Sequence, residues 1–341
     1  MHPSIFSFAG RRILITGASG FIGSQLCRRL CDQQAEVHAV SRVQRASDSH
    51  GGPRWWQGDA TDASFVRELF RRVQPEFVFH LAGETRGKRD LELVLPTFQQ
   101  NLTTSVNVLL AATENTCRRV VLAGSLEEPE TGRTASSPYA AAHVGIHAYA
   151  RMFHEIFAAP AVVARMFMVY GPGQEAVQKL IPYVTLALLR GESPKVSSGK
   201  RLVDWVYIDD VVEGLLALAQ APEIEGRALD LASGRFVSVR EVVEALVRLT
   251  GSSVGSIFGA EADRKMETSR KADIEETFAR TGWRPRTSLE EGLRRTIAWY
   301  EGKLKRKVLE SASVLFLAHL SAELLENLGT ITGALEPLAW A

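Results

Sequence analysis

Short apolar runs and amphipathic stretches alternate along the first half of the chain. The apolar runs predict buried strands over residues 12–16, 36–41, 77–81, 119–123 and 161–167, with a further strand before Asp59. The amphipathic stretches predict helices over residues 21–31, 63–72, 97–115 and 139–157. Strands that alternate with helices are joined by right-handed crossovers and lie parallel in one sheet. The pattern therefore predicts an α/β fold, with a doubly wound parallel sheet covered by helices on both faces.

The pattern changes after residue 170, where prolines and glycines separate short mixed elements. Helical spacing over residues 211–220 and 239–250 indicates that part of this region packs back against the sheet. We expect a large domain over residues 1–170, a smaller lobe mainly over 171–301 and a helical extension over 302–341. The apolar residues of the extension fit a packed terminal helix, an oligomer contact or a loosely ordered tail, and these alternatives stay open.

Composition and charge argue against several classes of protein. The 341 residues are 45% hydrophobic, which is enough for a large buried core. Because 40 Lys and Arg residues balance 39 Asp and Glu residues, the charge does not favour a nucleic-acid-binding role. The sequence has no apolar run of about 18 residues to predict a membrane span, and its short apolar start is unlike a signal peptide. The odd number of cysteines (Cys27, Cys31 and Cys117) favours a reducing cytoplasm over a disulfide framework.

Three glycines, Gly17, Gly20 and Gly23, lie between the first predicted strand and the first predicted helix. Glycines at such a turn let the backbone fold tightly and approach a pyrophosphate, whose charge the free N–H groups of the helix start would meet. The strand, glycine-rich turn and helix therefore predict a dinucleotide site.

The end of the second predicted strand indicates which dinucleotide binds. An acidic residue there would bind the adenosine ribose of NAD, but this strand ends in Ser41 and Arg42. A hydroxyl followed by a guanidinium would accept a 2′-phosphate instead, so we favour NADP, with NAD possible. Asp59 follows the third predicted strand, where it would meet the adenine.

Motifs in the same order along most of residues 11–300 resemble those of the extended short-chain dehydrogenase/reductase family, which contains sugar-nucleotide epimerases, dehydratases, decarboxylases and ketoreductases. The motifs are Thr16-Gly-Ala-Ser-Gly-Phe-Ile-Gly23, His80-Leu-Ala-Gly83, Asn101, Ser125, Tyr139, Arg165 with Tyr170-Gly-Pro172, Asp204-Trp-Val-Tyr-Ile-Asp-Asp210, and Gly282-Trp-Arg-Pro285 before Leu289-Glu-Glu-Gly-Leu293.

This resemblance implies a Rossmann-type NAD(P)-binding domain and a smaller C-terminal lobe that binds a small-molecule substrate. It also implies a homodimer formed through the helices predicted over residues 97–115 and 139–157. Its implied cofactor contacts, beyond those named above, are Ser19, Phe21, Ile22, Ala60, Leu81, Ala82 and Gly83.

The resemblance also implies catalytic roles for Ser125 and Tyr139. Ser125 would bond the reacting oxygen, and Tyr139 would exchange its proton. A tyrosine has an ordinary pKa of about 10, so it needs a nearby cation to act as a base at neutral pH. The family places a lysine four residues after the tyrosine, whereas this chain has His143, which would be mostly neutral at pH 7. We expect His143 to bond the nicotinamide ribose but to activate Tyr139 less, giving a slower or acid-shifted enzyme. The competing interpretation is a protein that only binds the cofactor.

The substrate side departs from the family pattern. Met168 stands where sugar-nucleotide members carry an asparagine, and Val203 stands where they carry an arginine. Arg201 and Arg264 are candidates to bind phosphate in their place. The loop after Gly83 would face the substrate through Glu84, Thr85 and Arg86.

Glu127 occupies the position of a glutamate found in the dehydratases and decarboxylases of the family, where it could act as a general base. Leu126 replaces the acidic proton donor of the dehydratases, which argues against 4,6-dehydration. The sequence therefore favours an NAD(P)-dependent enzyme of the epimerase, 4-ketoreductase or decarboxylase type, acting on a nucleotide-linked sugar. A reductase of a non-nucleotide carbonyl metabolite is the alternative. His143, His147 and His154 share one helical face, but no carboxylate or cysteine completes a metal site, so we predict none.

Overall fold

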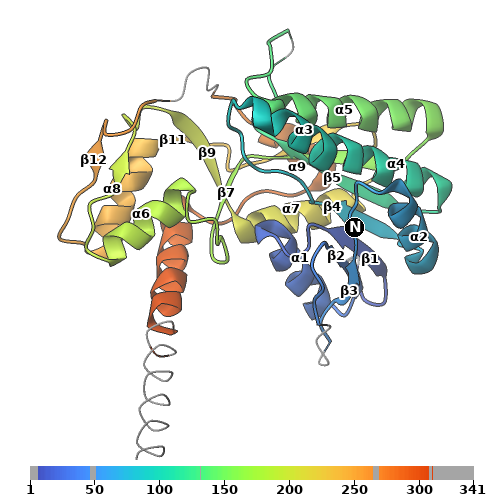
Figure 1. Cartoon of the computed structure of the whole chain (residues 1–341), viewed down its shortest axis with the longest axis horizontal. Coiled ribbons are helices and arrows are strands. Elements are labelled where there is room, and N and C mark those ends of the chain that lie inside the picture. Colours follow the sequence, from blue (N-terminus) through green and yellow to red (C-terminus); the bar gives the residue numbers. More distant parts are fainter. Residues whose placement is uncertain (1–6, 47–50, 131, 264–268, 307–308, 310–341) are drawn as a thin grey trace, which may run out of the picture.

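The computed structural model describes residues 7–46, 51–130, 132–263, 269–306 and 309. Within these ranges, seven strands form the main sheet in the order β10-β6-β5-β4-β1-β2-β3, and every adjacent pair is parallel (Figure 1). The strands are β1 (Arg12–Thr16), β2 (Glu36–Ser41), β3 (Arg54–Gln57), β4 (Phe77–His80), β5 (Arg119–Ser125), β6 (Ala161–Met166) and β10 (Ala228–Leu231). This confirms the predicted doubly wound sheet.

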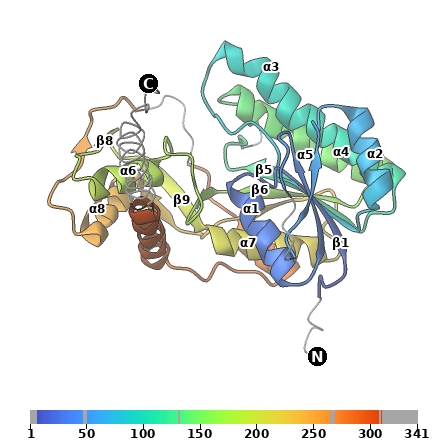
Figure 2. The same cartoon turned by 60° about the horizontal axis from the view of Figure 1, so that its bottom comes forward.

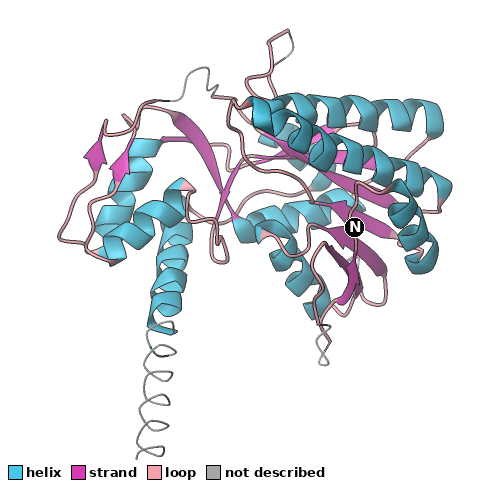
Figure 3. Ribbon diagram, viewed as in Figure 1, coloured by secondary structure: helices cyan, strands magenta, loops and turns pink. Residues whose placement is uncertain are grey.

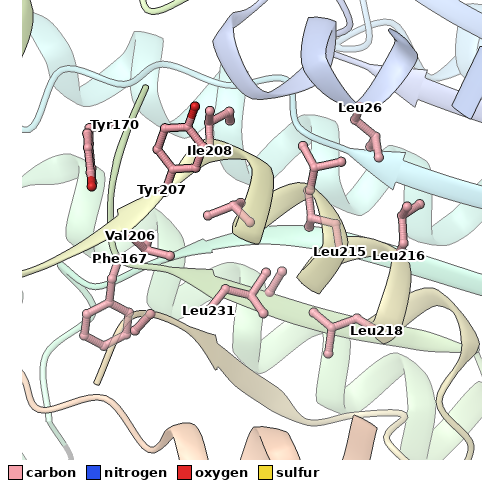
Figure 4. Close-up of a cluster of buried hydrophobic side chains, with 14 of the residues drawn as sticks. Leu26, Phe167, Tyr170, Val206, Tyr207, Ile208, Leu215, Leu216, Leu218 and Leu231 are labelled. Carbon is pink, nitrogen blue, oxygen red and sulfur yellow. The ribbon is translucent and has the colours of Figure 1, made fainter. Parts of the chain in front are cut away.

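Helices cover both faces of the sheet (Figures 2 and 3). One face carries α1 (Phe21–Asp32), α7 (Ile208–Gln220) and α9 (Ile274–Thr281), and the other carries α2 (Ala63–Val73), α4 (Thr104–Glu114) and α5 (Pro138–Phe157). The alternation along β1 explains this arrangement, because Ile13 and Ile15 pack on the α1 side while Leu14 packs on the α2 side. Figure 4 shows Leu26 of α1 beside Leu215 and Leu216 of α7, in the core of the first face.

The helix predicted over residues 97–115 is longer and less regular than expected. It begins with η1 (Leu91–Leu93) and α3 (Val94–Thr97), passes through the π-helical segment η2 (Phe98–Thr103) and continues as α4. The side chains of Thr104 and Ser105 donate hydrogen bonds to carbonyls of this segment, among them that of Asn101, at 3.1 and 2.7 Å. Such bonds compete with the regular backbone ladder, and π-helical turns occur frequently at functional sites.

A smaller lobe lies beside the sheet (left in Figure 1). Its strands β7 (Met168–Tyr170), β9 (Leu202–Tyr207) and β11 (Phe236–Ser238) form one small sheet, and β8 (Lys195–Val196) pairs with β12 (Ile257–Phe258). The helices α6 (Leu180–Leu189) and α8 (Val239–Thr250) complete it with a helix over residues 289–306.

Local side chains fix where several helices begin and end. Asp62 caps α2 by accepting from the Ser64 N–H, and Ser238 forms a capping box with Glu241 at the start of α8. Gly251 ends α8 with a φ of +64°, a conformation that suits glycine.

Most of the predicted extension over residues 302–341 lies outside the described residues. Where the chain is described, no helix is long and apolar enough to cross a membrane.

Candidate active site and cofactor cleft

A cleft of about 1800 Å³ runs along the carboxyl ends of the main strands and into the small lobe. Ligands of open α/β sheets bind at this edge. Its walls include Ser41 and Ser125 at strand ends, and Tyr183 and Trp205 from the small lobe. The structure brings together in it all the predicted cofactor residues, namely Gly17, Ser19, Gly20, Phe21, Ile22, Gly23, Ser41, Arg42, Asp59, Ala60, Leu81, Ala82, Gly83, Tyr139 and His143.

The glycine turn between β1 and α1 forms a tight cradle. Gly17 has a φ of +68°, and a Cβ there would lie 2.5 Å from the Leu81 backbone. A Cβ on Gly23 would lie 2.2 Å from the Gly17 carbonyl oxygen, so neither position has room for a side chain. Gly20 is the N-cap of α1 and supplies no side-chain cap, and the first turn carries no acidic residue. Because this leaves the helix start open to an anion, the turn fits a pyrophosphate.

The adenosine end of the cleft is polar and basic. The Ser41 hydroxyl accepts the Val43 N–H at 3.2 Å, so its own proton can be donated to a ligand. Arg42 and Arg45 both line the cleft, although only Arg42 was predicted from sequence. The Asp59 carboxylate accepts the Thr61 N–H at 2.9 Å, which fixes its loop beside the cleft.

Ser125 and Tyr139 meet in the cleft from different elements. Ser125 is the last residue of β5, and its Oγ accepts the Glu127 N–H at 3.2 Å. Tyr139 lies in the first turn of α5, where Pro138 and the N-cap Ser137 start the helix. The hydroxyl groups of Tyr139 and Ser125 lie close enough for Ser125 to lower the pKa of Tyr139. A substrate oxygen bound here would meet two hydroxyl groups that can share a proton.

The surroundings of Tyr139 keep its phenol protonated. Burial raises the pKa of Tyr139 to about 12, the Ser125 hydroxyl opposes the rise, and the charges of Glu127 and Glu128 add to it. The phenol is therefore protonated at neutral pH. The pKa of Tyr139 is therefore shifted upward, which favours activity at alkaline pH, whereas we expected an acid-shifted enzyme from His143.

His143 follows Tyr139 by one helical turn, with ring centroids 4.4 Å apart. The residue is only 4% exposed, and among the described residues neither ring nitrogen has a hydrogen-bond partner. Burial lowers the pKa of His143 to about 4, and the nearby Ala123 carbonyl opposes this only in part. His143 is therefore neutral at pH 7 and cannot replace a lysine charge. A buried polar group without a partner is costly, and the ribose hydroxyls of a dinucleotide would satisfy it.

The loop after β4 is fixed by the π-helical segment. Asn101 accepts the Glu84 N–H at 2.7 Å and donates to the Glu84 carbonyl at 3.0 Å. Glu84 and Thr85 line the cleft, as predicted residues of the substrate side, but Arg86 is not part of its lining. Arg86 instead pairs with the Glu84 carboxylate at 2.6 Å, and this bond lowers the pKa of Glu84. The structure therefore directs Arg86 toward Glu84 rather than toward a substrate.

Both lobes contribute to the substrate end. Met168 and Val203 line the cleft, where they offer no hydrogen-bonding side chain. Arg201 also lines it, and its Nη2 lies 3.6 Å from Glu127 Oε1 across the lobes. Arg264, the other predicted phosphate ligand, lies outside the described residues.

Several residues of the site were missed from the sequence. Lys195, Lys200 and Tyr183 line the substrate end. Lys195 lies on the two-residue strand β8, Lys200 in a loop and Tyr183 on α6, and no recognisable motif marks any of them. Glu128 lies behind the cleft and accepts the Ser125 N–H at 3.1 Å. In the sequence, only its position next to Glu127 pointed to Glu128, and that position did not show which of the two carboxylates faces the cleft.

Within the described ranges, no group of three His, Cys, Asp or Glu side chains could hold a metal ion. His147 is near the Glu128 carboxylate, at 3.8 Å, while His154 contacts the Ala159 carbonyl at 3.3 Å.

Comparison with known proteins identifies the family. The sequence pattern of the NAD dependent epimerase/dehydratase family matches residues 13–232. A UDP-glucuronate 4-epimerase of Thermodesulfobacterium geofontis is 25% identical over 316 residues, which cover 84% of this chain and 95% of that protein. A dTDP-glucose 4,6-dehydratase of Streptomyces griseus is 30% identical over 313 residues, covering 84% and 93%. The solved structure of MoeE5 in complex with UDP-glucose and NAD has a TM-score of 0.76 at 28% identity, covering 86% of this chain and 99% of that one.

The matches span both lobes and agree with the resemblance drawn from the motifs, and the relatives are enzymes of the epimerase/dehydratase type. The chain belongs to the NAD dependent epimerase/dehydratase family, whose members are oxidoreductases of the extended short-chain type.

Proposed function

We propose that the protein oxidises a hydroxyl-bearing carbon of a nucleotide-linked sugar, or reduces the corresponding ketone, as an epimerase, 4-ketoreductase or decarboxylase. The observation that carries this proposal is the neighbouring Ser125 and Tyr139 side chains, which line the same cleft as the glycine turn. A bound nicotinamide dinucleotide would supply the hydride chemistry, and the turn at Gly17 and Gly20 would hold its pyrophosphate. Ser125 would hold the reacting oxygen while Tyr139 gives or takes its proton.

Glu127 would act on the carbon next to a transient ketone. Its carboxylate lines the cleft two residues after Ser125, close to Arg201. Arg201, Lys195 and Lys200 give the substrate end cations for phosphate groups. Leu126 also lines the cleft and cannot donate a proton, which favours the proposed reaction types over 4,6-dehydration.

For the cofactor, the proposal is NADP rather than NAD. Ser41, Arg42 and Arg45 line the cleft near the end of β2, where an acidic residue would favour NAD. MoeE5 holds NAD in its solved complex. Tighter binding of NADH than of NADPH to this protein would therefore contradict the preference for NADP.

For assembly, the proposal is a homodimer. The exposed side chains Val94, Leu95 and Phe98 on the α3 and η2 segments, with Val144 and Tyr149 on α5, form apolar surface on the helices expected to meet a second copy. Sedimentation of the purified protein tests this, and a monomer across micromolar concentrations would contradict it. Cytoplasmic localisation stays a prediction from the cysteine content.

A second candidate is a reductase of a non-nucleotide carbonyl compound. The apolar Met168 and Val203 in the substrate end favour it, because they cannot bind a diphosphate. The neutral His143 beside Tyr139 favours a third, a cofactor-binding protein with weak catalysis.

Thermal unfolding with added ligands separates these candidates. NADPH and NADH would be compared first, and the better of the two would then be combined with UDP, dTDP, GDP, CDP or ADP. A ligand at about 100 times its Kd adds roughly 2.7 kcal/mol, which shifts the Tm of a chain of this size by several degrees. We expect a further shift with one diphosphate. A shift with the cofactor alone would overturn the nucleotide-sugar proposal in favour of the non-nucleotide substrate.

A further inference from the structure

A buried ion network lies directly behind Ser125. Its members are Glu128, Arg165 and Asp230, which are 4%, 7% and 4% exposed. The sheet register explains their meeting, because Gly124 of β5, Arg165 of β6 and Asp230 of β10 stand side by side. Arg165 donates from Nε to Glu128 at 3.1 Å and from Nη1 to Asp230 at 2.6 Å.

The Glu128 carboxylate folds back onto the end of its own strand. Its Oε1 accepts the Ser125 N–H at 3.1 Å, and its own N–H donates to the Ser125 carbonyl at 3.1 Å. A Cβ on Gly124 would lie 2.9 Å from Glu128 Oε1 and 2.6 Å from Val163 Cγ1, so a larger residue at this position would push both side chains out of this arrangement.

The rest of the network holds Glu128 from outside the turn. Arg270 donates to the Glu128 carbonyl at 3.0 Å, and the Asp273 N–H donates to Asp230 at 2.8 Å. Both Glu128 oxygens are thus engaged, one by Ser125 and the other by Arg165. Unlike Glu127, Glu128 does not line the cleft, so we assign it no direct role in binding a substrate.

We propose that Glu128 is a positioning residue that fixes Ser125 in the orientation from which its hydroxyl meets Tyr139. The inference rests on the proposed function for its catalytic consequence. The structural part stands on the buried bonds alone: removing the carboxylate leaves the buried Ser125 N–H without its acceptor and leaves the Arg165 guanidinium with Asp230 as its remaining acceptor. A shift of about 1 Å in a reacting group can cost on the order of 100-fold in rate.

Two variants test the role. Glu128→Gln keeps the shape of the side chain, but its amide group would face the Ser125 N–H or the Arg165 Nε–H with a second donor. Glu128→Ala removes the acceptor without adding a donor. The matched control is Glu130→Gln, in the same acidic run, because Glu130 is exposed and pairs only weakly with Arg133 at 3.7 Å. Melting temperature and NADPH binding check that each variant folds.

Hydrogen exchange at the Ser125 amide is the readout that does not depend on turnover. We expect faster exchange in both Glu128 variants and unchanged exchange in Glu130→Gln. We also expect kcat to fall about 10- to 100-fold with KM changed by less than about twofold. The titratable and charged groups that face Glu128 and Tyr139 are Glu127 on the same loop, the neutral His143 and His147 on α5, Arg165, Asp230 and Arg270. Loss of the Glu128 charge should therefore also move the Tyr139 limb of the pH profile to lower pH.

Unchanged exchange and unchanged kcat in folded Glu128 variants would overturn the inference. An unshifted pH profile with reduced kcat would leave only a structural role and would equally overturn it. Faster Ser125 exchange in a protein whose wild type turns over no sugar nucleotide would support the positioning of Ser125 and refute the proposed function instead.

Discussion

Replacing His143 by lysine should restore a positive charge beside Tyr139 and change the pH dependence of the reaction. The ring centroids of Tyr139 and His143 are 4.4 Å apart, so a lysine at position 143 can bring its charge near the phenol. A charge pair about 4 Å apart is worth roughly 4 kcal/mol at an effective dielectric of 20. This corresponds to about three pKa units. Burial raises the pKa of Tyr139 to about 12 in the native protein, so His143→Lys should lower it to roughly 9. Desolvation of the new ammonium makes this an upper bound on the change.

The assay is the rate of alcohol oxidation as a function of pH, with the substrate identified by the ligand screen. In the native protein the rate should still be rising at pH 9, because Tyr139 remains protonated. In His143→Lys the rising limb should lie about two to three units lower, so the phenolate fraction of Tyr139 at pH 7, and the rate that depends on it, should be about 100- to 1000-fold higher. His143→Gln is the matched control, because it keeps a polar side chain without a charge, and its limb should not move. Superimposable profiles for native protein and His143→Lys would refute the reasoning.

Three further predictions concern the cofactor cradle, cofactor choice and stability. Gly23→Ala places a Cβ 2.2 Å from the Gly17 oxygen, so NADPH binding measured by fluorescence should be lost, whereas Gly255→Ala, with open space around it, should bind normally. A retained Kd in folded Gly23→Ala would contradict the cradle. Arg42→Asp should weaken NADPH binding about 10- to 100-fold relative to NADH, from the loss of charge-assisted bonds and the added repulsion; an unchanged ratio of the two Kd values would show that Arg42 does not read the 2′-phosphate. Burial lowers the pKa of His80 and His143 to about 4. Because the unfolded chain has histidines of pKa about 6.5, it binds more protons below that pH, so stability present above pH 6.5 should be lost as the pH falls toward 4. The loss is about 2 kcal/mol for each histidine at pH 5. Thermal melts should show this loss, and His143→Gln should make the pH dependence shallower; an equally steep dependence would place the titrating groups elsewhere.

The sheet could be predicted from the sequence because its signals are local. Apolar runs such as Arg12–Thr16, bounded by a glycine turn, specify buried strands, and the alternation of Ile13, Leu14 and Ile15 fits a sheet covered on both faces. The π-helical segment Phe98–Thr103 could not be predicted in this way, because its apolar spacing resembles that of an ordinary helix. The shortest strands of the small lobe, β8 and β12, could not be predicted either, because two residues are too few to show periodicity.

The candidate site shows a similar division. The glycine turn, Ser125 and Tyr139 have fixed spacings that can be recognised, and the structure places them along one cleft. The role of Glu128 depends instead on the register that brings Arg165 and Asp230 beside it, which no local pattern specifies. The neutrality of His143 was anticipated from its ordinary pKa, but the alkaline direction of the Tyr139 shift required its burial to be known.

Turnover of nucleotide-linked sugars by the native protein and by Tyr139→Phe is the most direct test of the proposed function. Each protein would be incubated with UDP- and dTDP-linked hexoses and hexuronic acids, with NADP(H) or NAD(H) present, and the sugar products would be identified by proton NMR. We expect the native protein to convert one of these sugars, and Tyr139→Phe to bind it with similar affinity but convert it at least about 100-fold more slowly. Equal rates for the two proteins, or native activity confined to carbonyl compounds without a nucleotide, would contradict the account.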